Sequence, residues 1–337
     1  MPLNSYKQTG FTLIELMISL ALGLIIMAAA IMLFLTGQKS SALQQGFANI
    51  QDDANFGLGF IAQDIRHTNL NSLNSGINDR TIQGGIVLTS SANGFKDTTV
   101  TPNITYSNLP ENLIGTTVAT NLLSSGATGL SNVRGESSDQ LVIQYRPQYT
   151  RVGSNWVGGF DCEGEEIKFP VMTGGVETPL RIIVQRYFLR EDTNKDSKEP
   201  NTALALACDA GWYSESGTPL PDKIESFGNN GEVIMKRVDY FHVMLGIQKG
   251  EKLRYISIND YMALSAPRPR ILSVQLGVLV RSVQGVGNEP MIKDDQEFQV
   301  LDKKVTVKVP TNTTSKYVRQ VVSQTVALRN TFGERGQ

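Results

Sequence analysis

Histidine and cysteine are scarce in this chain of 337 residues, which has two of each. His67 and His242 are not spaced near Cys162 or Cys208, so the sequence offers no zinc-binding pattern. It also lacks a Gly-x-Ser-x-Gly elbow, a P-loop and a His-Glu-x-x-His motif. We therefore expect neither an enzyme nor a protein that needs a cofactor.

Neither sign of charge is in excess. Lysine and arginine number 31 against 32 aspartates and glutamates, which leaves a formal net charge of −1. Proteins that bind nucleic acid usually carry a clear excess of basic residues. The charge balance gives no reason to expect a nucleic-acid partner.

Proline is absent between Phe11 and Ile65, so no proline ring interrupts a helix there. Residues 11–35 are almost entirely apolar, and Glu15 is the one ionisable side chain among them. As a helix this segment is ~37 Å long, enough to cross a hydrocarbon layer of ~30 Å. A carboxylate at membrane depth costs roughly 2.5–3.5 kcal/mol, so Glu15 is expected to have a partner.

Two ordinary interpretations of this segment are open. One is a secretory signal peptide that is cleaved at Ala28-Ala29-Ala30, although only Lys7 precedes the apolar run and apolar residues continue beyond the alanines. The other is a signal anchor in which the glutamate has no particular role.

The residues from Gly10 to Leu16, Gly-Phe-Thr-Leu-Ile-Glu-Leu, support a third interpretation. They resemble the class III signal of type IV pilins and type II secretion pseudopilins. In that family a membrane peptidase cuts after the glycine, the new N-terminal residue is N-methylated, and the acid is retained. The resemblance implies a leader over residues 1–10, cleavage between Gly10 and Phe11, methylation of Phe11, and Glu15 as the retained acid.

Cleavage would leave a cationic amine on Phe11, about one helical turn from Glu15. In an assembly of axially displaced subunits, the Glu15 carboxylate of one chain could meet the Phe11 amine of the next. Such pairing would relieve the penalty on an isolated buried carboxylate. The alternative is that Glu15 reaches the membrane interface and pairs with nothing.

The helix is expected to continue beyond the membrane. Apolar residues recur with helical spacing at Leu43, Phe47, Ile50, Ala54, Leu58, Ile61 and Ile65. We predict one helix over residues 11–68, with a membrane span at 11–35 and an amphipathic second half packed on a head formed by residues 69–337.

The head reads as strand-rich. Predicted strands cover residues 141–145, 180–190, 233–246, 271–280, 303–309 and 317–328, and turn signals such as Gly174-Gly175 separate them. A mainly antiparallel sheet packed on the amphipathic helix gives an α+β fold. The head is long enough for one large core or two subdomains.

The final apolar strand closes on Leu328-Arg329-Asn330 and, with the size of the chain, is similar to the PilW family of minor pilins. This resemblance implies a structural subunit that helps to prime pilus assembly at or near the filament tip. It implies an inner-membrane protein with a periplasmic head that later joins the pilus at the cell surface. Implied partners are other minor and major pilins, the prepilin peptidase and a tip adhesin.

Two alternatives to a minor pilin remain. A J-type minor pseudopilin of a type II secretion system would share the N-terminus. A membrane-anchored, exported carbohydrate-binding or enzymatic domain could also mimic it. Motility, DNA uptake, adhesion and secretion are not distinguished by the sequence.

Two features of the head carry predictions of their own. An even cysteine count in an exported domain favours a Cys162–Cys208 disulfide over two separate thiols. Asp192, Asn194 and Asp196 alternate as in a calcium loop, but the glycine and the twelfth-position glutamate of such loops are replaced by Ser197 and Ala203. We therefore expect a solvated loop and no metal.

Overall fold

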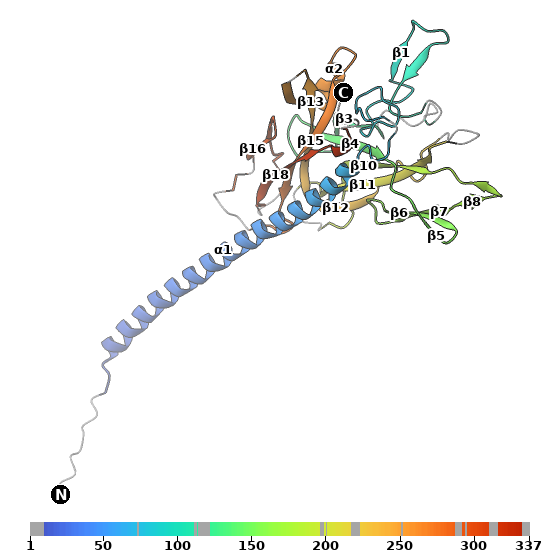
Figure 1. Cartoon of the computed structure of the whole chain (residues 1–337). Coiled ribbons are helices and arrows are strands. Elements are labelled where there is room, and N and C mark those ends of the chain that lie inside the picture. The colour runs from blue at the N-terminus through green and yellow to red at the C-terminus, as the bar shows by residue number, and fades with distance from the viewer. Residues whose placement is uncertain are drawn as a thin grey trace.

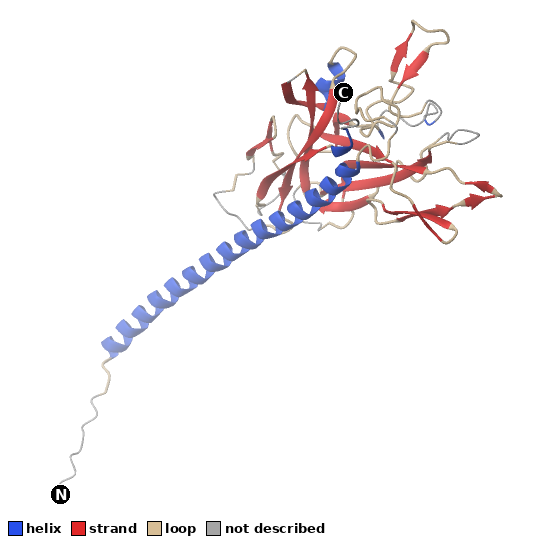
Figure 2. Cartoon of the chain, viewed as in Figure 1, coloured by secondary structure: helices blue, strands red, loops and turns tan. Residues whose placement is uncertain are grey.

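The structure is a computed structural model. It describes residues 10–331 apart from 73, 111–112, 114–121, 196–198, 200, 217–222, 251, 287–291, 294 and 310–315. Its main features are one very long helix and a head made mostly of strands (Figures 1 and 2).

Helix α1 (Leu13–His67) runs without a break for 55 residues, which confirms the predicted long helix. Its N-terminal half projects away from the head (Figure 1), and every residue from Gly10 to Ala42 is exposed. By length and composition α1 is the one helix among the described residues that could cross a membrane. The absence of proline is consistent with this unbroken course.

The second half of α1 packs on the head. Its buried residues are Ile50, Ala54, Gly57, Leu58, Ile61, Ala62 and Ile65. Gly57 permits a close approach, because an added Cβ would lie 2.6 Å from Cε of Met235. Phe47, which the stripe predicted to be packed, is 45 % exposed. The head meets this turn of α1 at Gly46, against Ser282 and Val286.

Two antiparallel sheets form most of the head. The first has the order β12-β11-β10-β4-β3 and the second β14-β13-β15-β18. The strands of the first are β3 (Ser125–Gly129), β4 (Ser138–Tyr145), β10 (Arg181–Glu191), β11 (Leu204–Ser214) and β12 (Glu232–Lys236). Those of the second are β13 (Val238–Lys249), β14 (Lys252–Ser257), β15 (Arg270–Arg281) and β18 (Arg319–Ala327).

Smaller elements extend from these sheets. They are the pair β1 (Phe95–Asp97) and β2 (Ile104–Tyr106), the three-stranded β5 (Thr150–Val152), β6 (Asn155–Phe160) and β7 (Glu166–Pro170), the pair β8 (Met172–Thr173) and β9 (Val176–Glu177), the pair β16 (Glu297–Val300) and β17 (Lys303–Thr306), and the short helices α2 (Ile258–Ala263) and η3 (Arg329–Thr331).

The largest apolar core joins α1 to both sheets. Leu58 and Ile61 of α1 share one cluster with Leu206 of β11, Phe241 of β13 and Leu276 of β15. Burial of large apolar side chains contributes about 1.5–3 kcal/mol each, so this junction holds α1 firmly. The predicted α+β fold, a long helix packed on antiparallel strands, is confirmed.

The strand predicted over residues 233–246 is wrong in one respect. It divides into β12 and β13 at Arg237, whose φ of +58° lies in the left-handed region. The two strands then belong to different sheets. Apolar residues on both sides of Arg237 concealed this break, because periodicity does not reveal a single left-handed residue.

Candidate membrane-insertion and assembly site

The predicted cleavage junction lies just outside α1. Gly10 and Phe11 precede the first helical residue, Leu13, and Thr12 is the N-cap with extended backbone angles. Phe11 is 90 % exposed, and an added Cβ on Gly10 would meet no atom within 4 Å. An exposed, non-helical peptide bond is the kind of segment that a protease can bind.

Glu15 forms a reciprocal cap with Thr12 at the start of α1. Its Oε2 accepts hydrogen bonds from the Thr12 backbone N–H and from the Thr12 hydroxyl, each at 2.9 Å. The Glu15 backbone N–H donates to Thr12 Oγ1 at 3.3 Å. This capping box satisfies donors that the first helical turn leaves free, and it turns the carboxylate toward the predicted new N-terminus.

The surface that follows is apolar on all sides. Met17, Ile26 and Phe34 are each more than 60 % exposed. Soluble monomers rarely leave so large an apolar surface in water, so this part of α1 requires lipid or other helices around it.

Comparisons with known proteins agree with this geometry. Residues 5–31 match the family model described as the prokaryotic N-terminal methylation motif. Residues 187–330 match the family model of the type IV pilus-assembly protein W, PilW. Over these two segments the chain is similar to PilW-like prepilins.

Further comparisons add little. A search of curated proteins found no match. Among solved structures, a type IV-like pilin from Thermus thermophilus is 13 % identical, with 57 % of this chain and 79 % of that chain covered and a TM-score of 0.25. The methylation motif and the apolar helix together indicate a membrane-anchored pilin.

In the head of this PilW-like chain, the predicted disulfide is confirmed. Cys162, in the turn between β6 and β7, is bonded to Cys208 of β11, with Cα atoms 6.1 Å apart. Both cysteines are buried. The bond therefore ties the β5–β6–β7 sheet to the first large sheet.

The loop that resembles a calcium site binds the guanidinium group of Arg237, a residue outside the loop. Arg237 Nη1 lies 2.5 Å from Asp192 Oδ2, and Nη2 donates to the Asn194 carbonyl at 3.2 Å and to Glu199 Oε1 at 2.6 Å. Asp196 lies outside the described residues. Burial alone would raise the pKa of Asp192, but the hydrogen bonds from Arg237 and from the Asn194 backbone N–H, together with the nearby positive charges of Arg237 and Lys236, outweigh burial and lower that pKa.

Arg237 begins a larger buried ion network. Arg281 pairs with Glu199, and it lies 3.5 Å from Asp239, which also accepts from Arg319 at 2.8 Å. Side chains of this network are at most 6 % exposed. This network was not predicted from the sequence, where its one visible sign is the charged group Lys236, Arg237 and Asp239 within a strand-like run that is mostly apolar.

A second cluster surrounds the buried His242 of β13. Its Nδ1 lies 2.7 Å from Asp139 Oδ2, and its Nε2 lies 2.7 Å from Asp302 Oδ1. Burial would lower the pKa of His242, but the two carboxylates outweigh burial and raise it. Because both ring nitrogens hydrogen-bond to carboxylates, the geometry fits a structural role in which His242 holds β4, β13 and the β16–β17 turn together.

Among the described residues, no group of three or more histidine, cysteine, aspartate or glutamate side chains is arranged to hold a metal ion. The residues that resemble the pilin motif therefore make up the candidate functional site: Gly10, Phe11 and Glu15 at the start of α1.

Proposed function

We propose that this chain is a minor pilin that helps to prime assembly of a type IV pilus at or near the filament tip. One observation carries the proposal. A capped glutamate stands one turn into an apolar helix that is exposed on all sides, directly after an accessible Gly10–Phe11 junction. The PilW match over residues 187–330 supports a minor rather than a major subunit.

In this proposal the prepilin peptidase removes residues 1–10 and Phe11 is N-methylated. Residues 11–35 then cross the inner membrane, the helix continues to residue 68, and residues 69–337 form a periplasmic head. On incorporation, α1 moves from lipid into the core of the filament, and the head reaches the cell surface. Its partners there are other minor and major pilins, with a tip adhesin as a further candidate.

Glu15 has a specific role in this step. In the free chain its carboxylate accepts hydrogen bonds from Thr12 of its own helix, and this local cap is compatible with insertion into the membrane. In the filament the carboxylate pairs with the Phe11 amine of the adjacent, axially displaced subunit. Because an isolated charge in a low-dielectric interior is costly, only one axial register is favourable, and the pair sets it.

A J-type pseudopilin of a type II secretion system is the second candidate, since the N-terminal motif serves both systems. A membrane-anchored, exported carbohydrate-binding or enzymatic domain is the candidate from another class. Neither has a specific observation in its favour among the described residues.

A Glu15→Ala substitution tests the proposal. We expect normal membrane insertion and a folded, disulfide-bonded head, but loss of the protein from sheared filaments and reduced piliation. The matched control is Asp53→Ala, which removes an exposed acid of α1 outside the membrane span and should change neither. Unchanged piliation with Glu15→Ala would contradict the proposal, and a selective loss of protein secretion would favour the pseudopilin.

A further inference from the structure

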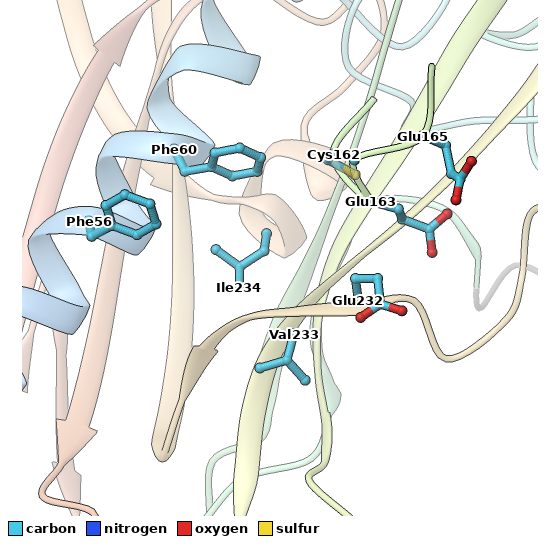
Figure 3. Close-up of a pocket in the computed structure, with 9 residues that line it drawn as sticks. Phe56, Phe60, Cys162, Glu163, Glu165, Glu232, Val233 and Ile234 are labelled. Carbon is cyan, nitrogen blue, oxygen red and sulfur yellow. The ribbon is translucent and has the colours of Figure 1, made fainter. Parts of the chain in front are cut away.

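An open groove runs along the flank of α1 beside β12 and the turn that contains Cys162 (Figure 3). Its volume is about 540 Å³. It is lined by Phe56, Phe60, Cys162, Glu163, Gly164, Glu165, Glu232, Val233 and Ile234. This volume lies within the range of pockets that hold drug-sized ligands or a few side chains.

One part of the groove is apolar. Phe56 and Phe60 are one turn apart on α1, outside the buried stripe, and Ile234 of β12 lies near them (Figure 3). Phe56 is 76 % exposed and Phe60 is 36 % exposed. Two neighbouring phenylalanines on a solvent-facing helix surface form an exposed apolar patch, and such a patch often marks a surface that another molecule covers.

The other part is acidic. Glu163, Glu165 and Glu232 gather opposite the phenylalanines (Figure 3), and the lining described above includes no lysine or arginine. The disulfide fixes this turn to β11, and Asp161 Oδ1 accepts from the backbone N–H groups of Glu163 and Glu165 at 3.0 Å. The acidic part is therefore held in place before any partner binds.

Charges in the acidic part repel each other. Burial raises the pKa of Glu163 to about 7, with further contributions from Asp209, Asp161 and Glu232, although the Ala210 backbone N–H opposes the shift. Of the nearby cations, Arg186 is paired with Asp209 at 2.9 Å, and Arg190 Nη2 donates to the backbone carbonyl of Gly231 at 3.2 Å. A cation brought by a partner would relieve this repulsion.

A second hollow of about 420 Å³ shares Phe60 with the groove and is also lined by Phe160, which is 70 % exposed. Two hollows that share a lining residue offer room for successive side chains of a bound polypeptide segment.

We propose that this groove binds a protein segment in which a lysine or arginine lies next to a large apolar side chain. The apolar side chain packs on Phe56, Phe60 and Ile234. The cation reaches Glu163, Glu165 and Glu232, where charge-assisted hydrogen bonds are stronger than neutral ones. Its aliphatic stem lies near the phenylalanine rings, which also attract cations. The inference is independent of the role in priming, since it concerns the head and the exposed part of α1 alone.

The test uses the full chain in phosphatidylcholine nanodiscs and a short peptide that places one lysine between two leucines in a glycine–serine background. A carbodiimide joins the peptide amine to carboxylates in contact with it, and mass spectrometry locates the bonds. We expect coupling at Glu163, Glu165 or Glu232 to exceed coupling at exposed Glu177 by about tenfold, which corresponds to about 1.4 kcal/mol. A peptide with serine in place of leucine should lose this preference.

Two variants distinguish binding in the groove from attraction of the peptide to the carboxylates alone. Phe56→Ser and Phe60→Ser keep every carboxylate, and we expect each to reduce coupling at the three glutamates to the level of Glu177. The control Val176→Ser, which replaces a 69 % exposed side chain on β9, should have no effect. Phe56 is largely exposed, so its variant tests the proposal even if Phe60→Ser fails to fold.

Two results would overturn the proposal. One is equal coupling at Glu177 and at the groove, or coupling that does not change in Phe56→Ser. The other is coupling of the chain to itself through these glutamates in preference to the peptide, which would assign the groove to a second copy.

Discussion

Glu15 and Thr12 form a reciprocal cap in which Glu15 Oε2 accepts two hydrogen bonds from Thr12, each at 2.9 Å. The residue assigned to subunit pairing therefore also orders the first turn of its own helix. In the proposed filament the same carboxylate also pairs with the Phe11 amine of a neighbouring subunit, so Glu15 serves both the cap of its own helix and the contact between subunits.

A Thr12→Val substitution separates capping from pairing. It removes the hydroxyl but keeps the backbone N–H that reaches Glu15, and loss of an N-cap side chain typically costs about 1 kcal/mol. We expect faster hydrogen exchange at the amide of Glu15 in nanodiscs, with incorporation into filaments retained. Thr12→Ser, which keeps the hydroxyl, should behave as wild type. Unchanged exchange in Thr12→Val would show that the cap does not form.

Arg237 is expected to be essential for the stability of the head. Arg237→Met leaves the carboxylates of Asp192 and Glu199 buried without this guanidinium, and breaking a buried pair costs about 3–5 kcal/mol. The unfolding midpoint in urea should fall sharply, whereas Lys236→Met at the adjacent exposed position should change it little. Equal effects of the two substitutions would contradict the assigned network.

The same network predicts how wild-type protein responds to calcium. Because a guanidinium already bridges Asp192, Asn194 and Glu199, added calcium chloride or a chelator should leave the midpoint unchanged. A calcium-dependent rise would instead restore the calcium-loop interpretation.

Asp64 joins α1 to the first sheet, and its contribution to the free energy of unfolding depends on pH. It accepts a hydrogen bond from the Tyr187 hydroxyl at 2.8 Å, and burial raises its pKa to about 6, despite that hydrogen bond and with a smaller contribution from Asp161. The Asp64 carboxyl therefore ionises at a lower pH in the unfolded chain than in the folded one. Stability is therefore highest below about pH 4 for this group and is lost as pH rises through about 6.

An Asp64→Asn substitution should remove this dependence, because the amide does not ionise and its oxygen can still accept from Tyr187. We expect it to raise the free energy of unfolding at neutral pH by about 3 kcal/mol and to flatten the change between about pH 4 and pH 6. Asp53→Asn, on the exposed surface of α1, is the control. Denaturant unfolding across this range checks the prediction, and a neutral-pH loss of stability in Asp64→Asn would contradict it.

Local pattern was enough to predict α1. Helical spacing from Leu43 to Ile65 and the absence of proline make the helix visible in the sequence, and the Gly10–Leu16 motif marks where it starts. Strands β4, β10, β15 and β18 were likewise predicted, because each is a long apolar or alternating run. The cysteine pair followed from count and compartment.

Features that depend on distant residues were not predictable. Arg237 meets Asp192 across 45 residues and His242 meets Asp139 across 103, and no local pattern reports such contacts. The short strands β5 to β9 have mixed composition and little alternation. Phe56 and Phe60 lie outside the apolar stripe, so their groove with Glu163 became visible only in the folded head.

Intact mass spectrometry of the mature protein from sheared filaments tests the central claim most directly. The account predicts a chain that begins at Phe11 and carries one additional methyl group on its amine, free to pair with Glu15 of a neighbour. A chain that retains residues 1–10 in functional filaments, or one that begins at Ile31 after cleavage at the alanines, would contradict it.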